Sequence, residues 1–396
     1  MRKFFLLCAI FINFFSMAFS TSLNVEEACE KDKAFLEKIN FDTLNISPLT
    51  NTVKVYGKRG SLNQNLKIKK YSYNGENSNI KINWSLPIPY SRPEVRFFIS
   101  YYQKHPQEII SSLKRAQPYF KTILKIVREH GLPDEIAFLP IVESKFRIKA
   151  KSFAGAAGLW QLMPATARYL GLKVKRYYDE RYDIVKSTHA ACRYLKYLYN
   201  IFGDWDLAIA AYNSGPATIK RQLRKVSYEK NVWALNKLPL ETQEYIPEFY
   251  AILTLIKYAH LYGLELPKTF ESVPDIKYEV KIKTTLKDIS KLFKLPYSKL
   301  LIYNAAYVKG IVPKNHIIYL TKEISHALPS YGIIKKDARN IYIYYKVKKG
   351  DSLWKIARKF GISVRYLKKI NYLKSHRLKP GQTLLIFWIA KSTPLS

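Results

Sequence analysis

The C-terminal part of the chain contains an internal repeat, and a repeat limits the possible folds more than any single residue does. Shifting the sequence by 67 positions, without a gap, places seven apolar or aromatic residues and one asparagine of one segment on similar residues of another. The matched pairs are Tyr278/Tyr345, Val280/Val347, Leu286/Leu353, Ile289/Ile356, Phe293/Phe360, Leu295/Ile362, Leu300/Leu367 and Asn304/Asn371. A fixed period of this kind indicates two copies of one small folding unit. We therefore expect such units at residues 277–321 and 344–388.

The second copy shows the expected order of elements most clearly. A short alternating strand leads to a turn at Gly350–Asp351, and helices then start at Ser352 and at Ser363. Serine hydroxyls at these positions can accept hydrogen bonds from the first amides of a helix. A turn at Pro380–Gly381 precedes a last strand over residues 383–386. The predicted unit is β-α-α-β.

This second copy resembles a LysM domain, a module that binds N-acetylglucosamine-containing glycans such as peptidoglycan and chitin. The resemblance rests on the segment YYKVKKGDSLWKIARKFGISVRYLKKINYLKSHRLKPGQTLLIF. It implies a glycan-binding surface on the loop after the first strand and the loop before the last strand. The matching residues are Gly350, Asp351, Ser352, Leu378 and Pro380. The first copy has Lys283–Thr284 and Lys287 in place of Gly350–Asp351 and Trp354, so whether it binds glycan stays open.

The start of the chain has the three parts of a secretory signal. The basic pair Arg2–Lys3 precedes an apolar run of about fifteen residues, and Ala18 and Ser20 suit cleavage after Ser20. The run is short for a membrane span and contains Asn13. We expect residues 1–20 to be a cleaved signal, with a retained membrane anchor as the alternative. No later segment is long and apolar enough to cross a bilayer.

Export predicts a location in the periplasm or cell envelope. Leu6 and Leu7 are bulky and Cys8 comes early, which argues against a lipidated cysteine. After removal of the signal, Cys29 and Cys192 remain, and either one bridge or two free thiols would fit.

The formal net charge of +36 indicates a polyanionic partner or surface. Charge alone attracts nucleic acid, acidic lipid and anionic wall polymer alike. Because export argues against nucleic acid, we expect the cell wall and an acidic membrane surface to be the partners.

The remainder of the chain divides into two regions that differ in the periodicity of their apolar residues. Residues 21–93 lack a sustained period and end in a proline-rich stretch, which predicts a spacer. Residues 94–264 have helix-period segments, the clearest of them over 108–131, where Gly131 ends the pattern. Its apolar face comprises Ile109, Leu113, Ala116, Phe120, Ile123, Leu124 and Val127. Further helices are expected at 162–170, 187–201, 205–212, 216–224 and 241–260, which makes this an all-α domain.

One carboxylate in this domain, Glu143, ends the segment LPDEIAFLPIVE, in which it follows the apolar run from Ile136 to Val142. Pro133 suits a first helical position. Apolar neighbours at Ile136, Leu139, Ile141 and Val142 would desolvate the carboxyl and favour its protonated form. A protonated carboxyl near neutral pH is what a general acid in glycoside cleavage requires. A glutamate that merely lies near a helix end is the plain alternative.

The domain resembles the lytic murein transglycosylases, which have a goose-lysozyme-like fold. The resemblance rests on ESKF at 143, AKSFAGAAGLWQLMP from 150, AAYNSGP from 210 and LPLETQEYIP from 238. The implied overall class is mainly α, a lysozyme-like domain followed by two small LysM-type units. The small residues of the second motif would let a sugar approach the backbone closely.

The resemblance also implies roles for single residues. Glu143 would be the only general acid and base, with Ser144 beside it. The substrate cleft would be lined by Ser152, Gln161, Met163, Tyr212 and Asn213, with Glu241 nearby. Met163 could instead belong to the core, Asn213 could serve a turn, and Glu241 could stabilise a helix start.

The implied reaction is substrate-assisted and uses no metal or cofactor. Glu143 would protonate the bridging oxygen and then accept a proton from the sugar's own 6-hydroxyl, which closes a 1,6-anhydro ring. A hydrolytic muramidase and an inactive wall-binding protein are the alternatives. Four aspartates of the same domain could each supply a second carboxylate: Asp179, Asp183, Asp204 and Asp206.

Overall fold

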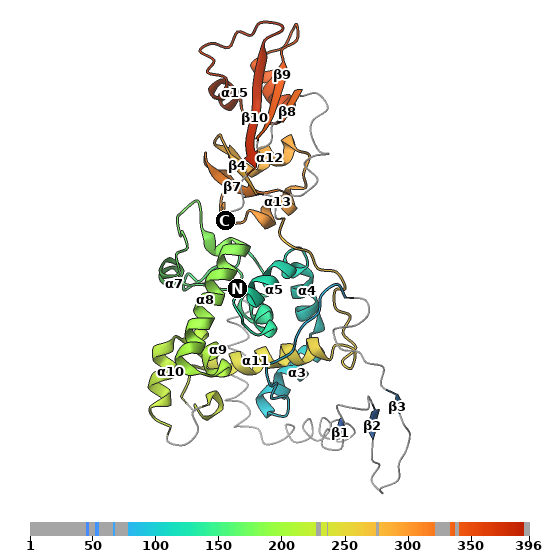
Figure 1. Ribbon diagram of the computed structural model, residues 1–396, viewed down its shortest axis with the longest axis vertical. Coiled ribbons are helices and arrows are strands. Elements are labelled where there is room, and N and C mark those ends of the chain that lie inside the picture. The colour runs from blue at the N-terminus through green and yellow to red at the C-terminus, as the bar shows by residue number, and fades with distance from the viewer. Residues whose placement is uncertain are drawn as a thin grey trace, which may run out of the picture. The chain divides into compact units, whose positions relative to one another are not determined.

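The computed structural model describes residues 45–46, 52–54, 66–67, 78–226, 231–235, 237–274, 277–320, 333–336 and 340–391 (Figure 1). The predicted signal and most of the predicted spacer lie outside the described residues. The chain forms two units, Met1–Tyr71 and Ser72–Ser396. In the first, strands β1 (Asn45–Ile46), β2 (Thr52–Lys54) and β3 (Leu66–Lys67) pair antiparallel in that order.

The second unit begins with a mainly helical domain, as the sequence predicts. Its helices are α3 (Pro93–Lys104), α4 (Pro106–Ala116), α5 (Phe120–Glu129), α6 (Leu139–Ser144), α7 (Pro164–Tyr169), α8 (Ile184–Phe202), α9 (Trp205–Ser214), α10 (Pro216–Leu223) and α11 (Leu240–Lys257). Short 3-10 turns lie at η2 (Asp134–Phe138), η3 (Glu180–Tyr182) and η4 (Val232–Ala234). Among the described residues, no helix is both long and apolar enough to cross a membrane.

The helical pattern over 108–131 forms two helices, α4 and α5, instead of one continuous face. The break contains Pro118, which has no amide to donate and whose ring clashes with a preceding turn. Gly131 has a φ of 68°, a conformation that glycine adopts without strain and that stops the pattern as expected.

Helix α11 packs against α3 and α9 (Figure 1), and it also contacts α6. Eight consecutive residues of α11, from Phe249 to Ile256, are buried. Helices α8 and α9 begin at aspartate caps: Asp183 accepts from the Lys186 amide at 2.9 Å and Asp204 from the Leu207 amide at 2.8 Å. Such caps satisfy amides that a helix start leaves unpaired.

Residues on both sides of the predicted domain also pack against it. Ile82 is buried, and the Leu86 amide donates to the buried Glu135 carboxylate at 2.8 Å. The side chain of Asn79 exchanges two hydrogen bonds with the backbone of Phe270, at 2.9 and 2.8 Å. Residues 78–92 are therefore not a free spacer, because they cover the core together with the segment around 270.

The C-terminal repeats share one sheet and one core. The first repeat contains β4 (Lys277–Val280), β5 (Thr284–Thr285), α12 (Leu286–Leu292), α13 (Tyr297–Tyr303), β6 (Ile311–Val312) and β7 (His316–Tyr319). The second contains β9 (Asn340–Lys346), α14 (Leu353–Phe360), α15 (Val364–Ile370) and β10 (Thr383–Lys391), preceded by β8 (Ile333–Lys336). The strand order is β7-β4-β10-β9-β8. Strand β10 is longer than predicted, because its end pairs with β4 of the first repeat.

The predicted helix starts of the second repeat are confirmed. Ser352 accepts from the Lys355 amide at 3.2 Å, and Ser363 accepts from the Tyr366 amide at 3.0 Å. Phe293 of the first repeat contacts Phe387 of the second edge to face, with ring centroids 5.6 Å apart. The two repeats therefore form one folded domain with a shared sheet and a shared core.

Candidate active site

Glu143 lies in the last turn of the short helix α6, whose end is unusually sharp. Lys145 and Phe146 have φ values of 51° and 54°, a left-handed conformation that is uncommon for residues other than glycine. Their amides donate to the carbonyls of Ile141 and Pro140, at 3.0 and 3.1 Å. These hydrogen bonds pair carbonyls at the end of α6, and the chain leaves the helix axis directly after Ser144.

The Glu143 carboxyl is half-buried and has one side-chain partner. The hydroxyl of Tyr245, on α11, donates to Glu143 Oε1. Burial raises the pKa of Glu143 to about 8, with smaller contributions in the same direction from Glu241 and Glu248. The hydrogen bond from Tyr245 opposes this shift, because it stabilises the ionised form. The carboxyl is thus protonated at neutral pH.

The side chain of Ser144 belongs to the protein interior, although the residue follows Glu143 directly. Its side chain is buried, and its hydroxyl is within hydrogen-bond distance of the carbonyls of Leu159, at 2.9 Å, and Pro140, at 3.2 Å. This residue therefore joins α6 to the segment that carries the second sequence motif.

That segment, residues 150–163, folds back on itself and is called here the cleft loop. Ser152 accepts from the Ala156 amide at 3.0 Å, and the Gly158 amide donates to the carbonyl of Ala150 at 2.9 Å. Gln161 has a φ of 42°, and its side-chain amide donates to the Gly158 carbonyl at 2.7 Å. Met163, at the end of the loop, is 42% exposed and so lies at the surface, not in the core.

Two aromatic residues hold the middle of the cleft loop. Trp160 is buried and its indole donates to Thr188 at 2.9 Å, which makes it a core residue. The hydroxyl of Tyr212, on α9, donates to the Trp160 carbonyl at 2.7 Å. Burial raises the pKa of Tyr212, and the negative charge of Glu143 raises it further, which places the two side chains near one another.

The last two sequence motifs meet beside this group. Asn213 accepts from the hydroxyl of Thr242 at 2.7 Å and lies 3.5 Å from Glu241. Glu241 is exposed and acts on the pKa of Glu143. The structure therefore gathers Glu143, Tyr212, Asn213 and Glu241 in one region, although they come from three different helices.

Sequence reasoning did not single out Tyr245 or Glu248. Tyr245 lies four residues after Glu241, so the two share a helix face, and that spacing within LPLETQEYIP was the available signal. Glu248 continues the same helix and forms an ion pair of 3.0 Å with Lys145. Of the two partners, the Glu248 carboxylate acts on Glu143 and raises its pKa.

The four aspartates that could have supplied a second carboxylate have other partners. Asp179 pairs with Arg181 at 2.8 Å, and Asp183 and Asp204 cap helices. Asp206 accepts from the hydroxyl of Tyr250 and from the indole of Trp233. The carboxylates that raise the pKa of Glu143 are instead Glu241 and Glu248.

The predicted glycan-binding residues of the second repeat lie on its surface loops. Gly350, Ser352 and Pro380 are exposed, while Asp351 and Leu378 are half-buried. Asp351 accepts from the Lys348 amide at 2.7 Å and from the Tyr345 hydroxyl at 2.9 Å. The first of the two loops is thereby held in a defined shape.

Comparison with known families agrees with this architecture. Residues 123–234 match the transglycosylase SLT domain, and residues 345–387 match the LysM domain. The chain therefore carries an SLT-type transglycosylase domain followed by a LysM domain, as the two resemblances in the sequence predicted.

Among curated proteins, the chain is similar to membrane-bound lytic murein transglycosylase D of Escherichia coli K12. The two are 35% identical over 291 residues, which cover 69% of this chain and 64% of that relative. The N-acetylmuramoyl-L-alanine amidase sle1 of Staphylococcus saprophyticus is 52% identical over 42 residues, 11% of this chain and 13% of its own. A crystal structure of an inactive mutant of lytic transglycosylase Slt from Pseudomonas aeruginosa covers 38% of this chain and 25% of its own, with 25% identity. The TM-score between the two structures is 0.30.

Proposed function

We propose that this protein is a lytic transglycosylase that cleaves the β-1,4 bond between N-acetylmuramic acid and N-acetylglucosamine in peptidoglycan, leaving 1,6-anhydro ends. The observation that carries the proposal is the Glu143 carboxyl, whose pKa of about 8 keeps it protonated beside the cleft loop. A general acid works best when its pKa is close to the working pH.

The hydrogen bond from Tyr245 indicates which oxygen carries the proton. Because Tyr245 donates to Oε1, the carboxyl proton resides on Oε2, from which it passes to the bridging oxygen of the substrate. The C–O bond breaks and the positive charge that develops at the anomeric carbon is stabilised by the N-acetyl carbonyl of the same sugar.

The second half of the reaction reverses the role of Glu143. The carboxylate, stabilised by the Tyr245 hydroxyl, removes the proton from the sugar's 6-hydroxyl. The 6-oxygen bonds to the anomeric carbon and the carboxyl regains its proton, so the reaction consumes no water. One carboxylate therefore suffices, and Lys145 compensates the nearby charge of Glu248.

A water-using muramidase is the second candidate, and Glu241 is the observation that favours it. This carboxylate is exposed, near Glu143 and on a different helix, which are the properties of a base that directs water. The products distinguish the two reactions, because hydrolysis leaves reducing ends.

The test is mass spectrometry of fragments released from purified peptidoglycan by the protein and by Glu143→Gln. Anhydro-muramyl ends that disappear in the variant are expected. Reducing ends would establish the muramidase. Absence of release by a folded protein that still binds the wall would leave a binding protein whose helical domain is inactive.

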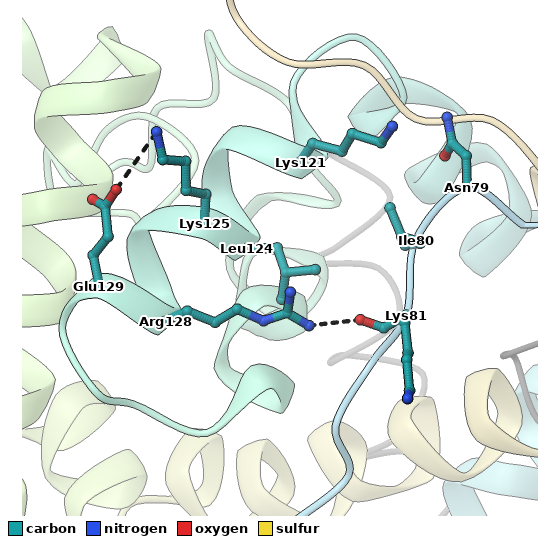
Figure 2. A pocket seen from close by; sticks show the side chains of 8 residues that line it. All are labelled: Asn79, Ile80, Lys81, Lys121, Leu124, Lys125, Arg128 and Glu129. Atoms are coloured by element: carbon teal, nitrogen blue, oxygen red, sulfur yellow. Dashed lines mark hydrogen bonds and ion pairs between the residues drawn. The ribbon is translucent and has the colours of Figure 1, made fainter.

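We further propose that the second repeat holds peptidoglycan strands and that the protein is exported and associates peripherally with acidic membrane. The basic surface of α5 supports the membrane contact. Lys81, Lys121, Lys125 and Arg128 line a hollow of about 540 Å³ together with Asn79, Ile80, Leu124 and Glu129 (Figure 2).

In this hollow, Arg128 donates to the Lys81 carbonyl and Lys125 pairs with Glu129 at 3.7 Å. The ammonium groups of Lys81 and Lys121 form no ion pair within the described part of the chain. The test is sedimentation with vesicles of acidic or neutral lipid at two salt concentrations. Binding to acidic vesicles should weaken with salt and in Lys121→Glu, and equal binding to neutral vesicles would refute the proposal.

A further inference from the structure

A buried arginine, Arg181, forms hydrogen bonds with the backbone of the cleft loop. Arg181 Nη1 donates to the carbonyls of Gly155, at 2.7 Å, and Leu162, at 3.0 Å. The other nitrogens of the guanidinium bind Asp179, at distances of 2.8 to 3.2 Å. One planar group thus ties the two arms of the loop together, and these arms carry Ser152 and Gln161.

The backbone at Arg181 also touches the loop directly. A Cβ atom placed on Gly158 would lie 1.9 Å from the Arg181 carbonyl oxygen, so only glycine permits this approach. The φ of Gly158 is 85°, which again favours glycine. Any displacement of Arg181 would therefore move the loop that leads to Trp160 and Gln161.

The first repeat packs against this same segment. The Asp179 amide donates to the carbonyl of Ala306 at 2.9 Å, and the Val308 amide donates to that of Tyr177 at 3.2 Å. Lys149, just before the cleft loop, donates to the Ala305 carbonyl at 2.6 Å. Ala305 is 2% exposed and packs in one apolar cluster with Ala157 and Tyr182.

The loops of the first repeat that would correspond to a glycan groove are joined to one another. Strands β5 and β6 pair Thr284 with Val312, and the Leu286 amide donates to the Gly310 carbonyl at 2.8 Å. The 67-residue shift maps these pairs onto residues 351–353 and 377–379 of the second repeat, where the described strands show no such pairing. The two repeats therefore differ at the loops where the resemblance to LysM domains predicts glycan binding.

We infer that the first repeat is a support for the catalytic domain instead of a second glycan-binding module, and that Arg181 is the positioning residue through which it supports the cleft loop. Three successive hydrogen-bonded contacts connect them. The Asp179 amide donates to the Ala306 carbonyl, the Asp179 carboxylate binds Arg181, and Arg181 donates to the two loop carbonyls. This inference rests on the proposed function for its kinetic consequences, whereas its structural part can be measured independently.

The kinetic test compares Arg181→Met, Arg181→Lys and the control Arg193→Met on soluble, uncrosslinked glycan strands. Arg193 also donates to one backbone carbonyl, that of Leu170, but lies outside the cleft loop. We expect Arg181→Met to lower kcat at least tenfold with a smaller change in KM, Arg181→Lys to recover part of the loss, and the control to stay near the wild type. A folded Arg181→Met protein with wild-type kcat would overturn the inference.

A second variant covers the case in which Arg181→Met does not fold. Ala305→Arg places a charged side chain in the contact with Ala157 and should loosen the loop without touching the cleft. Hydrogen exchange at the amides of Ala156, Gly158 and Leu162 should then become faster by at least tenfold, whether or not the wild type is active. Unchanged exchange would refute the support, whereas absence of anhydro products from the wild type would refute only the proposed function.

Discussion

The hydrogen bond from Tyr245 to Glu143 allows a sharp prediction about pH dependence. Glu143 acts as an acid when it is protonated, so activity should fall as pH rises through its pKa of about 8. Tyr245→Phe removes a donor that stabilises the ionised carboxylate and leaves the ring in place. The pKa of Glu143 should therefore rise, and the alkaline limit of activity should move to higher pH.

The magnitude follows from the strength of the bond that is lost. A hydrogen bond to a charged group contributes roughly 1.5–3 kcal/mol, which corresponds to a rise of about one to two pKa units. The same loss acts on the step in which Glu143 becomes a carboxylate, so kcat near pH 7 should fall roughly 10- to 150-fold. The assay is release of soluble fragments at several pH values, with kcat/KM reporting the free enzyme.

The matched control is Tyr250→Phe. Tyr250 lies on the same helix and also donates to a half-buried carboxylate, that of Asp206, but this pair is separate from the Glu143 group. The control should lose stability while keeping the wild-type pH limit. A Tyr245→Phe enzyme whose alkaline limit stays in place or moves down would refute the reasoning.

Three further predictions concern stability and binding. Glu143 stays protonated in the fold up to about pH 8 but ionises near 4.5 when exposed, so the unfolded chain binds fewer protons between these values. The free energy of unfolding of Glu143→Gln should therefore match that of the wild type near pH 4 and exceed it by about 4 kcal/mol at pH 8; equal thermal melting at pH 8 would contradict this. The rings of His130 and His189 are joined by a 2.9 Å hydrogen bond, and burial lowers the pKa of both below 6.5, with Arg193 and Lys196 lowering that of His130 further. The unfolded chain then binds more protons, so urea midpoints should fall as pH drops below 6.5, less so in His189→Gln; identical slopes would reject the idea. Finally, Asp351→Ala should weaken sedimentation with insoluble peptidoglycan several-fold, whereas Thr284→Ala, at the matching position of the first repeat, should not, and the reverse order would assign the groove to the first repeat.

Much of the architecture was already determined by the sequence. Helix caps such as Ser352 and Ser363 act within four residues, so their positions are local and the structure confirms them. The helical domain, the LysM domain and their order were also predicted, and the family matches confirm both. Glu143 could be proposed as the acid because its apolar neighbours are adjacent in the chain.

The tertiary structure alone decided how these parts are supported. Tyr245 is 102 residues from Glu143, and no local pattern states that their side chains meet. The burial of Ser144 is equally non-local, because its hydroxyl binds a carbonyl of the cleft loop.

The same reason explains the largest difference from expectation, which concerns the repeats. Their sequence period predicted two similar units, but the period cannot state that β10 crosses from one repeat to pair with β4 of the other. Nor can it state that Ala305 and Ala306 pack beside Arg181. Backbone pairing between distant segments depends on three-dimensional packing and not on the identity of neighbouring residues, so only the folded chain shows it.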